Sequence, residues 1–349
     1  MAWLRTRNSM PRQLKSWAML KVIQPSPGGE QPTQRKKVMG KATRDAYGEA
    51  LLELGKEIPE IVVLDADLSK STKSNLFAKA FPERFFNFGI CEANMVSAAA
   101  GLASCGKIPF ASSFASFLIC KSFDQIRMGI ANPRLNVKLV GSHGGISLGE
   151  DGASQQSVED FALALSLPGF TVIHPADEIS TRKLTRQIAE KKGPVFMRTG
   201  RPKAELIYSP EDKIQIGKAH VLREGKDATI FACGLMVAEA LDAAEALAAK
   251  GDDVGVIDMH TLRPLDENAV FNAARNSKAF VVAEEHLVHG GLGAMIAQTV
   301  STFFPVPIEF VGLRETYAES GTPAELFEKY GLTAKAIEQA VENVLNRKD

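Results

Sequence analysis

Residues 88–117 read FGICEANMVSAAAGLASCGKIPFASSFASF, and the interpretation of the whole chain starts from them. The alanine-rich segment after Gly89 favours a helix, which Gly101 and Gly106 are expected to end. Glu92 then falls in the first turn of an otherwise apolar helix. Two interpretations stay open. Glu92 either complements the helix dipole, or it is a buried acid that holds or shares a proton at a ligand site.

The composition is that of an ordinary globular protein. The chain has 349 residues, of which 45% are hydrophobic and 23% charged, with a formal net charge of zero. This length predicts about two domains, and the zero net charge gives no indication of a nucleic-acid or membrane partner. No apolar run is long enough to cross a bilayer. The four cysteines lack metal-ligand or disulfide-framework spacing, which favours reduced thiols in a cytoplasmic protein.

The N-terminal segment differs from the rest of the chain. Residues 1–39 contain eight Lys and Arg residues and one acid, Glu30, so the remaining chain has 33 basic and 40 acidic side chains. We expect residues 1–37 to form a disordered basic tail. A transit peptide and a start codon assigned too far upstream, with Met39 near the true start, both stay open.

Helix and strand patterns alternate from Thr43 onwards. Short apolar runs such as 61–64 and 137–140 predict buried strands, and periodic segments such as 177–189 predict the helices between them. A proline-containing segment without periodicity separates two such units. We therefore predict an α/β protein with two domains, each a mainly parallel sheet with helices on both faces. The predicted bounds are 38–203 for the first domain, 204–216 for a linker and 217–349 for the second domain.

Two glycine-rich stretches resemble known motifs but lack their context. Residues 145–149 fit the nucleophile elbow of α/β-hydrolases, but loop residues rather than an apolar helix follow them. Residues 290–293 resemble a dinucleotide-binding turn, but Ile296 stands where its last small residue belongs. His143 lies in a glycine-rich loop with two acids after it. A functional role and a hydrogen-bonded role in shaping that loop both stay open for His143.

Several segments, taken together and in this order, resemble the transketolase family: GICEANM at 89–95, PFASSFASF at 109–117, FDQIR at 123–127, GSHGG at 141–145 and GEDGASQ at 149–155. The resemblance runs from about Lys41 to the C-terminus. It covers only the second half of the family's chain, the pyrimidine-binding domain and the C-terminal domain. The Gly-Asp-Gly element, with which the family's first half holds magnesium and the cofactor diphosphate, does not occur in this sequence. The chain thus resembles the C-terminal subunit of a split transketolase.

The resemblance implies thiamine diphosphate as the cofactor. The family glutamate at the position of Glu92 binds the aminopyrimidine ring and shares a proton with it, and the cofactor acts as electron sink while a C–C bond of a ketose breaks. Phe114 and Phe117 match residues that stack on this ring, with core packing as the alternative. Gln155 matches a cofactor-site glutamine of animal-type enzymes, where many microbial ones have histidine. Mg²⁺ and the diphosphate are expected to be held by a partner subunit, so no metal ligand is expected in this chain.

The resemblance also implies a sugar-phosphate site. His143 matches a histidine that contacts hydroxyl and carbonyl oxygens of the substrate, and we expect it to take part in catalysis. Asp151 matches the acid that contacts the hydroxyl at the second position of the donor. Arg44, Ser71 and Arg201 match residues that hold the terminal phosphate, for which guanidinium groups are well suited.

These assignments predict the C-terminal subunit of a transketolase of the pentose phosphate pathway, which moves a glycolaldehyde unit from a ketose phosphate to an aldose phosphate. We expect it to need an N-terminal, diphosphate-binding partner and to form a homodimeric core within a heterotetramer, without nucleic-acid or membrane partners. Two alternatives stay open: the beta subunit of the decarboxylating component of a 2-oxo acid dehydrogenase, and a catalytically silent paralogue that assembles with or regulates a partner. One extra residue between Phe117 and Phe123, relative to the animal pattern, leaves residues 119–121 without an assigned role.

Overall fold

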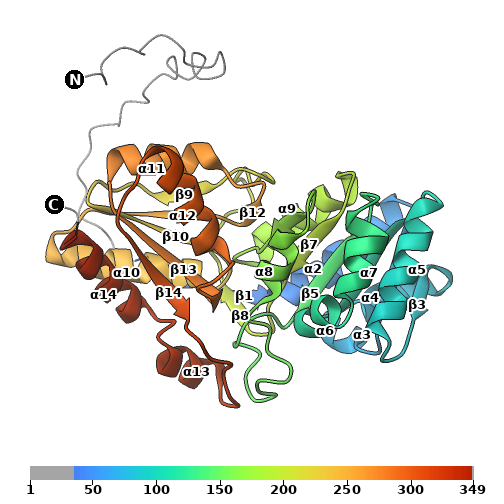
Figure 1. Ribbon diagram of the computed structural model, residues 1–349. Helices are drawn as coiled ribbons and strands as arrows, with labels where there is room; N and C mark the ends of the chain where they lie inside the picture. The colour runs from blue at the N-terminus through green and yellow to red at the C-terminus, as the bar shows by residue number, and fades with distance from the viewer. Residues whose placement is uncertain (1–34, 348–349) are drawn as a thin grey trace, which may run out of the picture. The chain divides into compact units, whose positions relative to one another are not determined.

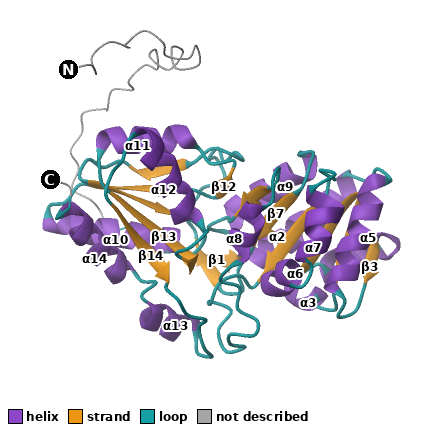
Figure 2. Cartoon of the chain, viewed as in Figure 1, coloured by secondary structure: helices purple, strands orange, loops and turns teal. Residues whose placement is uncertain are grey.

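The computed structural model describes residues 35–347, so residues 1–34 of the expected basic tail lie outside the described part of the chain. Two large sheets with helices around them make up most of this part, as the strands and helices in Figure 2 show. Both sheets belong to one compact unit that begins at Lys36. None of the helices in the described residues is long and apolar enough to cross a membrane.

The larger sheet has seven strands. Their order is β12 (Thr261–Arg263), β6 (Thr171–Ile173), β7 (Val195–Arg198), β5 (Lys138–Ser142), β4 (Ile108–Phe114), β2 (Ile61–Asp65) and β3 (Phe85–Asn87). Of these strands, β3, β5, β7 and β12 are labelled in Figure 1. Every pairing is parallel except that of β12 with β6. The chain runs from β2 to β3 on one side and returns to β4 on the other. The carboxyl ends of β2 and β4 therefore flank a topological switch point, where ligands of open α/β sheets bind.

Strand β2 shows why these runs are almost wholly apolar. Val63 packs in one hydrophobic cluster, and its neighbours Val62 and Leu64 pack in another on the opposite side of the sheet. Successive side chains of a strand point to opposite faces, so a strand covered by helices on both faces needs apolar residues throughout.

Helices cover both faces of the larger sheet. One face packs against α2 (Thr43–Glu57), α4 (Asn75–Ala80) and α9 (Glu178–Glu190). The other packs against α5 (Glu92–Ser104), α6 (Ala115–Cys120), the π-helical segment η3 (Ile126–Ala131) and α8 (Asp160–Ser166). Short helical turns complete this part: α3 (Ser69–Thr72), η2 (Pro82–Arg84) and α7 (Phe123–Gln125).

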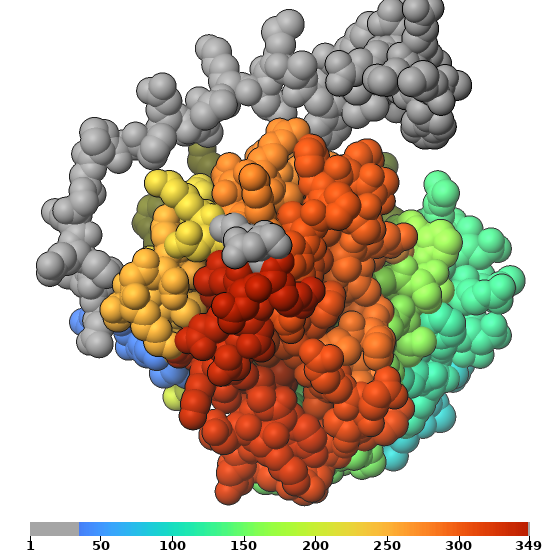
Figure 3. All heavy atoms as spheres, turned by 60° about the vertical axis from the view of Figure 1, so that its left-hand side comes forward, coloured from blue at the N-terminus to red at the C-terminus, as the bar shows by residue number. Residues whose placement is uncertain are grey.

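The smaller sheet has five strands. Their order is β14 (Ile308–Leu313), β13 (Phe280–Leu287), β10 (Ala228–Ala232), β11 (Val254–Asp258) and β9 (His220–Arg223), of which only β9 is antiparallel to its neighbour. One face packs against α10 (Met236–Lys250) and α14 (Ala334–Leu345), which lie together in Figure 3 as light-orange and red surface. The other packs against α11 (Glu267–Asn276) and α12 (Leu292–Phe303). The remaining elements are α13 (Pro323–Tyr330) and a separate pair formed by β1 (Met39–Ala42) and β8 (Lys203–Glu205).

The predicted fold class is confirmed, because both sheets are mainly parallel and carry helices on both faces. One local expectation was wrong in part: helix α5 continues through Gly101 and ends at Ser104, two residues before Gly106. The PFASSF segment, which the sequence left unassigned, is the central strand β4. The domain bounds 38–203, 204–216 and 217–349 stay predictions; strand β12, from beyond the linker, joins the larger sheet.

Candidate functional site

Four neighbouring strands of the larger sheet end at one edge, in the order β7, β5, β4 and β2. Ser71 follows β2, Phe114 ends β4, His143 follows β5 and Arg201 follows β7. The parallel sheet therefore gathers these residues, which are distant in the sequence, at the edge where α/β proteins place their ligands.

Asp65 shapes the loop after β2. Its buried carboxylate accepts hydrogen bonds from the Leu68 amide at 2.6 Å, the Thr72 hydroxyl at 2.7 Å and the Ser74 hydroxyl at 2.9 Å. Burial raises the pKa of Asp65, and these three donors oppose that shift. Asp65 is thus engaged within the protein, and its role is to hold the turn that carries Ser71.

His143 is a neutral histidine whose tautomer follows from its neighbours. Its Nε2 lies 2.9 Å from Nη1 of Arg44, and its Nδ1 lies 2.8 Å from Oγ of Ser142. A guanidinium group can only donate, so Nε2 accepts and the proton is on Nδ1, which donates to Ser142. The same Arg44 nitrogen donates to the carbonyl oxygen of Ser71 at 3.2 Å. The backbone of His143 has a φ of 58°, a left-handed conformation that side chains rarely adopt outside functional or tightly constrained sites.

One cation, Arg44, contacts His143, and the charges of two more, Arg201 and Lys73, also act on it. Burial is the first cause that lowers the pKa of His143 to about 3, and the charges of Arg44, Arg201 and Lys73 lower it further. Lys73 ends α3 in a left-handed conformation and forms an ion pair with Asp45 at 3.0 Å. Sequence reasoning missed Lys73. Its position directly after the polar run that follows β2 was the available signal.

Arg201 and Asp151 lie together at the same edge. Nη1 of Arg201 is 3.6 Å from Oδ2 of Asp151 and 3.5 Å from Oε2 of Glu150, and it donates to the carbonyl oxygen of Leu148 at 2.5 Å. Both partners of the Arg201–Asp151 pair are more than a third exposed, so this charge pair faces solvent and remains accessible to a ligand.

An aromatic and acidic group of residues lies next to the cationic cluster. The rings of Phe114 and Phe117 stack with their centres 5.6 Å apart, and the His143 ring stacks on Phe114 at 3.9 Å. Glu92, at the start of α5, is only 3% exposed. Its carboxylate meets the ammonium group of Lys121 at 3.2 Å, and this ammonium lies 4.2 Å from the centre of the Phe117 ring. One cation thus contacts a buried carboxylate and an aromatic face together, an arrangement that fits a flat heteroaromatic ring with an N–H group.

Gln155 is the last of the sequence-predicted residues. Its backbone carbonyl oxygen accepts a hydrogen bond at 3.0 Å from the hydroxyl of Ser116, the residue before Phe117. The structure therefore places Gln155 next to the aromatic group. No group of three or more His, Cys, Asp or Glu residues in the described chain is arranged to hold a metal ion.

Comparison with known proteins gives two domain matches. Residues 39–205 match the transketolase pyrimidine binding domain, and residues 217–337 match the transketolase C-terminal domain. The chain is 44% identical over 305 residues to a putative transketolase C-terminal section of Methanocaldococcus jannaschii, which covers 86% of this chain and 95% of that protein. It is 43% identical over 306 residues to the 6-deoxy-6-sulfo-D-fructose transketolase subunit SqwH of Clostridium sp. (strain MSTE9), with 88% and 95% covered.

Longer relatives and a solved structure agree with these matches. The chain is 39% identical over 310 residues to the transketolase of Homo sapiens, which covers 88% of this chain but only 49% of the human protein. A solved structure described as a split gene transketolase, inactive beta4 tetramer, superposes with a TM-score of 0.84 at 50% identity and covers 89% of this chain and all of that one. The chain therefore belongs to the transketolase family, and it corresponds to the C-terminal section that holds the pyrimidine-binding and C-terminal domains.

Proposed function

We propose that this chain is the C-terminal subunit of a thiamine-diphosphate-dependent transketolase that transfers a glycolaldehyde unit from a ketose phosphate to an aldose phosphate. One observation carries the proposal: Arg44 contacts the neutral His143 at the carboxyl edge of the larger sheet, where the charges of Arg201 and Lys73 also act on the imidazole. Clustered cations suit a phosphate group, and a neutral imidazole beside them suits hydroxyl and carbonyl oxygens.

The residues around Glu92 fit the cofactor's aminopyrimidine ring. Glu92 would hold the proton shared with a ring nitrogen, and the face of Phe117 would stack on the ring. When bound, thiamine diphosphate supplies the electron sink for breaking the C–C bond beside a ketose carbonyl. Gln155 would lie beside the same aminopyrimidine ring, because its backbone is hydrogen-bonded to Ser116, the residue before Phe117.

The hydrogen bonds of His143 limit what it can do. Because its Nδ1 proton is donated to Ser142 and its Nε2 accepts from Arg44, no N–H of the ring is free. A substrate hydroxyl can donate to Nε2 when Arg44 turns towards the phosphate. In this proposal His143 therefore acts as a hydrogen-bond acceptor that orients the sugar, and Asp151 accepts from a hydroxyl group of the donor.

The diphosphate and Mg²⁺ are assigned to a partner. The described residues offer no metal-binding cluster, and the chain spans about half of the human transketolase. We propose an N-terminal transketolase subunit as this partner, in a heterotetramer with a homodimeric core of the present chain. The similar split gene structure, whose description calls its beta4 tetramer inactive, supports a need for a second type of chain.

Reconstitution tests the proposal. The purified chain, an N-terminal-type transketolase chain and their mixture are each assayed with thiamine diphosphate, Mg²⁺, xylulose 5-phosphate and ribose 5-phosphate. Activity is expected in the mixture alone. Turnover by the rigorously pure single chain would contradict the need for a partner, and a stable but inactive mixture would favour the silent paralogue. Turnover of 2-oxo acids without sugar transfer would favour the dehydrogenase alternative.

A second substrate class deserves its own assay, because one relative is named for 6-deoxy-6-sulfo-D-fructose. A sulfonate is a tetrahedral anion like phosphate, so the cluster of Arg44, Arg201 and Lys73 could hold either group. The two donors, fructose 6-phosphate and 6-deoxy-6-sulfofructose, are compared in the same mixture by kcat/KM. A preference for the sulfonate would change the assigned substrate while keeping the transketolase reaction.

A further inference from the structure

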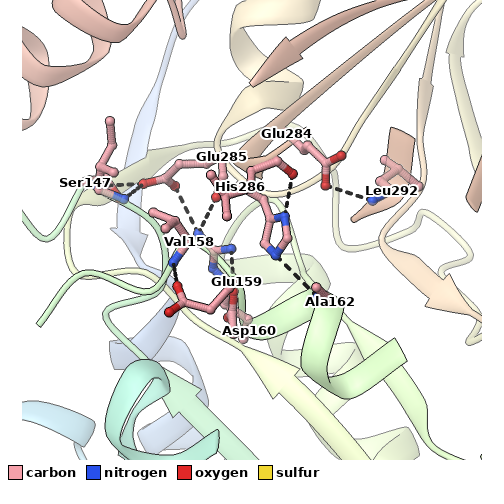
Figure 4. A network of polar contacts seen from close by, with 12 residues as sticks. Ser147, Val158, Glu159, Asp160, Ala162, Glu284, Glu285, His286 and Leu292 are labelled. Carbon is pink, nitrogen blue, oxygen red and sulfur yellow. Dashed lines mark hydrogen bonds and ion pairs between the residues drawn. The ribbon is translucent and has the colours of Figure 1, made fainter. Parts of the chain in front are cut away.

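Two neighbouring carboxylates near the end of β13, Glu284 and Glu285, are both buried and bind different pairs of backbone amides (Figure 4). Glu284 accepts from the amides of Leu292 and Gly293 at 2.7 and 2.8 Å, at the N-terminus of α12. Glu285 points to the other face of the strand and accepts with one oxygen from the amides of Ile146 and Ser147 at 2.7 and 2.6 Å. Glu284 thus caps the helix that follows it, whereas Glu285 holds a loop that precedes it by 138 residues in the sequence.

Arg198 completes the arrangement from the end of β7. Its side chain is fully buried; Nη2 donates to the carbonyl oxygen of Glu285 at 2.8 Å and lies 3.6 Å from its Oε2, and Nη1 lies 3.3 Å from Asp160. The loop approaches these charges only because it has glycine at two positions. A Cβ on Gly144 would lie 1.9 Å from Nε of Arg198, and one on Gly145, whose φ is +75°, would lie 2.1 Å from Oε1 of Glu285.

The loop held in this way carries the proposed substrate residues. It begins after His143 and closes where Gly145 and Ser157 exchange two backbone hydrogen bonds, at 2.7 and 3.1 Å. Asp151 and Gln155 lie between these two positions. Strand β13 contacts the far end of the loop as well, because the Leu287 amide donates to the Val158 carbonyl oxygen at 2.9 Å.

We propose that Glu285 is a positioning residue for substrate recognition: with Arg198 it fixes the loop that follows His143 and carries Asp151 and Gln155, so the second half of the chain shapes the site built on the first. The substrate part of this inference rests on the proposed transketolase function. Glu285 itself is buried beneath the loop, and its carboxylate is engaged by the amides of Ile146 and Ser147 and by Arg198. The ammonium and guanidinium groups that face the substrate belong to other residues, so Glu285 acts only through the backbone that it holds.

Amide hydrogen exchange of the full-length chain tests the contact without any activity assay. The variant is Glu285→Gln, and Glu284→Gln is the matched control, with the same chemical change, strand and burial. We expect Glu285→Gln to speed exchange in peptides spanning Ile146 and Ser147 by roughly 5- to 30-fold, as a weakened charge-assisted contact predicts. Glu284→Gln should speed exchange at Leu292 and Gly293 alone. Unchanged exchange in the loop of Glu285→Gln, or equal loosening of the loop in both variants, would overturn the assignment.

Kinetics of the reconstituted complex test the positioning role. Glu285→Gln should raise KM for the ketose phosphate by roughly 5- to 30-fold with a smaller change in kcat. Its affinity for thiamine diphosphate, measured by calorimetry, should change less than KM, because of the residues assigned to the cofactor only Gln155 lies on the loop, whereas Glu92 and Phe117 belong to α5 and α6. A loosened loop with an unchanged KM would overturn the positioning role. If the wild-type complex turned over no ketose at all, the proposed function would be wrong, and the exchange comparison would still decide whether Glu285 fixes the loop.

Discussion

Nζ of Lys121 lies 3.2 Å from Oε1 and 3.3 Å from Oε2 of Glu92. The same ammonium lies 4.2 Å from the centre of the Phe117 ring. Lys121 thus contacts the two groups that the proposed function assigns to the aminopyrimidine ring of the cofactor. The Lys121 side chain is 47% exposed whereas that of Glu92 is 3% exposed, so the lysine can leave for solvent while the acid stays buried.

Removing this ammonium should strengthen binding of the pyrimidine ring. In the proposed site the pyrimidine ring must displace Lys121 before it can contact the Glu92 carboxylate and the Phe117 face. Lys121→Ala removes this competing ammonium group. Because the Lys121 half of the ion pair is exposed to solvent, we take its contribution as about 1 kcal/mol and expect about fivefold tighter binding. Calorimetric titration of the full chain with 4-amino-5-hydroxymethyl-2-methylpyrimidine measures it, with Lys107→Ala as an exposed-lysine control. Weaker binding to Lys121→Ala would show that the lysine belongs to the binding site.

Glu92→Gln separates the proton-sharing role from helix capping. The amide has the same shape, so we expect a normal fold and normal assembly with the partner, but loss of most turnover because the amide cannot share the ring proton in the same way. Steady-state assays of the reconstituted complex at saturating thiamine diphosphate measure this, with the exposed Glu60→Gln as control. Near-normal activity would return Glu92 to the role of complementing the helix dipole.

The fold class could be predicted because it depends on local patterns, whereas strand β4 could not. Apolar runs and periodic helices identified most elements within a few residues of their observed bounds. Strand β4 carries Ser112 and Ser113 in its interior, both fully buried, so its sequence lacks the apolar run typical of a central strand. The hydroxyl of Ser112 is hydrogen-bonded to the hydroxyl of Tyr47 at 2.9 Å. Only the packed structure brings this partner to the serine.

The site residues also divide into those that the sequence predicted and those that it did not. Motif resemblance identified those whose spacing along the chain is characteristic, such as Glu92 and His143. Lys121 meets Glu92 from 29 residues away and Glu285 meets Ser147 from 138 residues away, and no pattern in the sequence indicates either contact. Asp65 ends strand β2, at the edge where α/β sheets bind ligands, yet its carboxylate is engaged by the turn that follows it.

His143 should stay neutral across the physiological range. Burial and the neighbouring cations lower the pKa of His143 to about 3, below the ordinary value of about 6.5. Between these values the unfolded chain binds a proton that the folded chain does not, so this group's contribution to stability falls as pH drops from about 6.5 towards 3. Nitrogen-15 NMR of the histidine rings, assigned with His143→Gln, should show a proton fixed on Nδ1 from about pH 5 to pH 8. A His143 titration midpoint within this range would contradict the burial argument.

Two glycine substitutions should change stability in opposite directions. Gly101 lies inside α5 with no atom within 4 Å of an added Cβ, so Gly101→Ala should stabilise the chain by roughly 0.5–1 kcal/mol. At Gly145 the φ of +75° and the close approach of Glu285 both oppose a side chain, so Gly145→Ala should destabilise by roughly 1–3 kcal/mol. Urea unfolding followed by circular dichroism measures both changes. An unchanged free energy of unfolding in Gly145→Ala would mean that the loop can shift to accommodate the added Cβ.

Arg201 and Asp151 form an ion pair at 3.6 Å, so their roles in donor recognition should be coupled. Arg201→Ala should raise KM for xylulose 5-phosphate by roughly 10- to 150-fold, the effect of losing a charge-assisted contact, and should affect hydroxypyruvate far less because it carries no phosphate. Asp151→Ala should impair the ketose more than hydroxypyruvate, because hydroxypyruvate has a carboxylate where the ketose has a hydroxylated carbon next to the carbonyl.

The double variant decides between separate contacts and a shared one. Each single substitution also frees the remaining partner from the ion pair, so the loss in kcat/KM for the double variant should differ from the product of the single losses by up to about fivefold, the size of an exposed pair. The measurement is a double-mutant cycle on both donors in the reconstituted complex. Strict additivity with the expected donor preferences would mean that the two side chains bind the phosphate and the hydroxyl independently. Equal losses on both donors in every variant would mean that the pair supports the loop rather than contacting the substrate, because hydroxypyruvate lacks both the phosphate and the hydroxyl that the two side chains would contact.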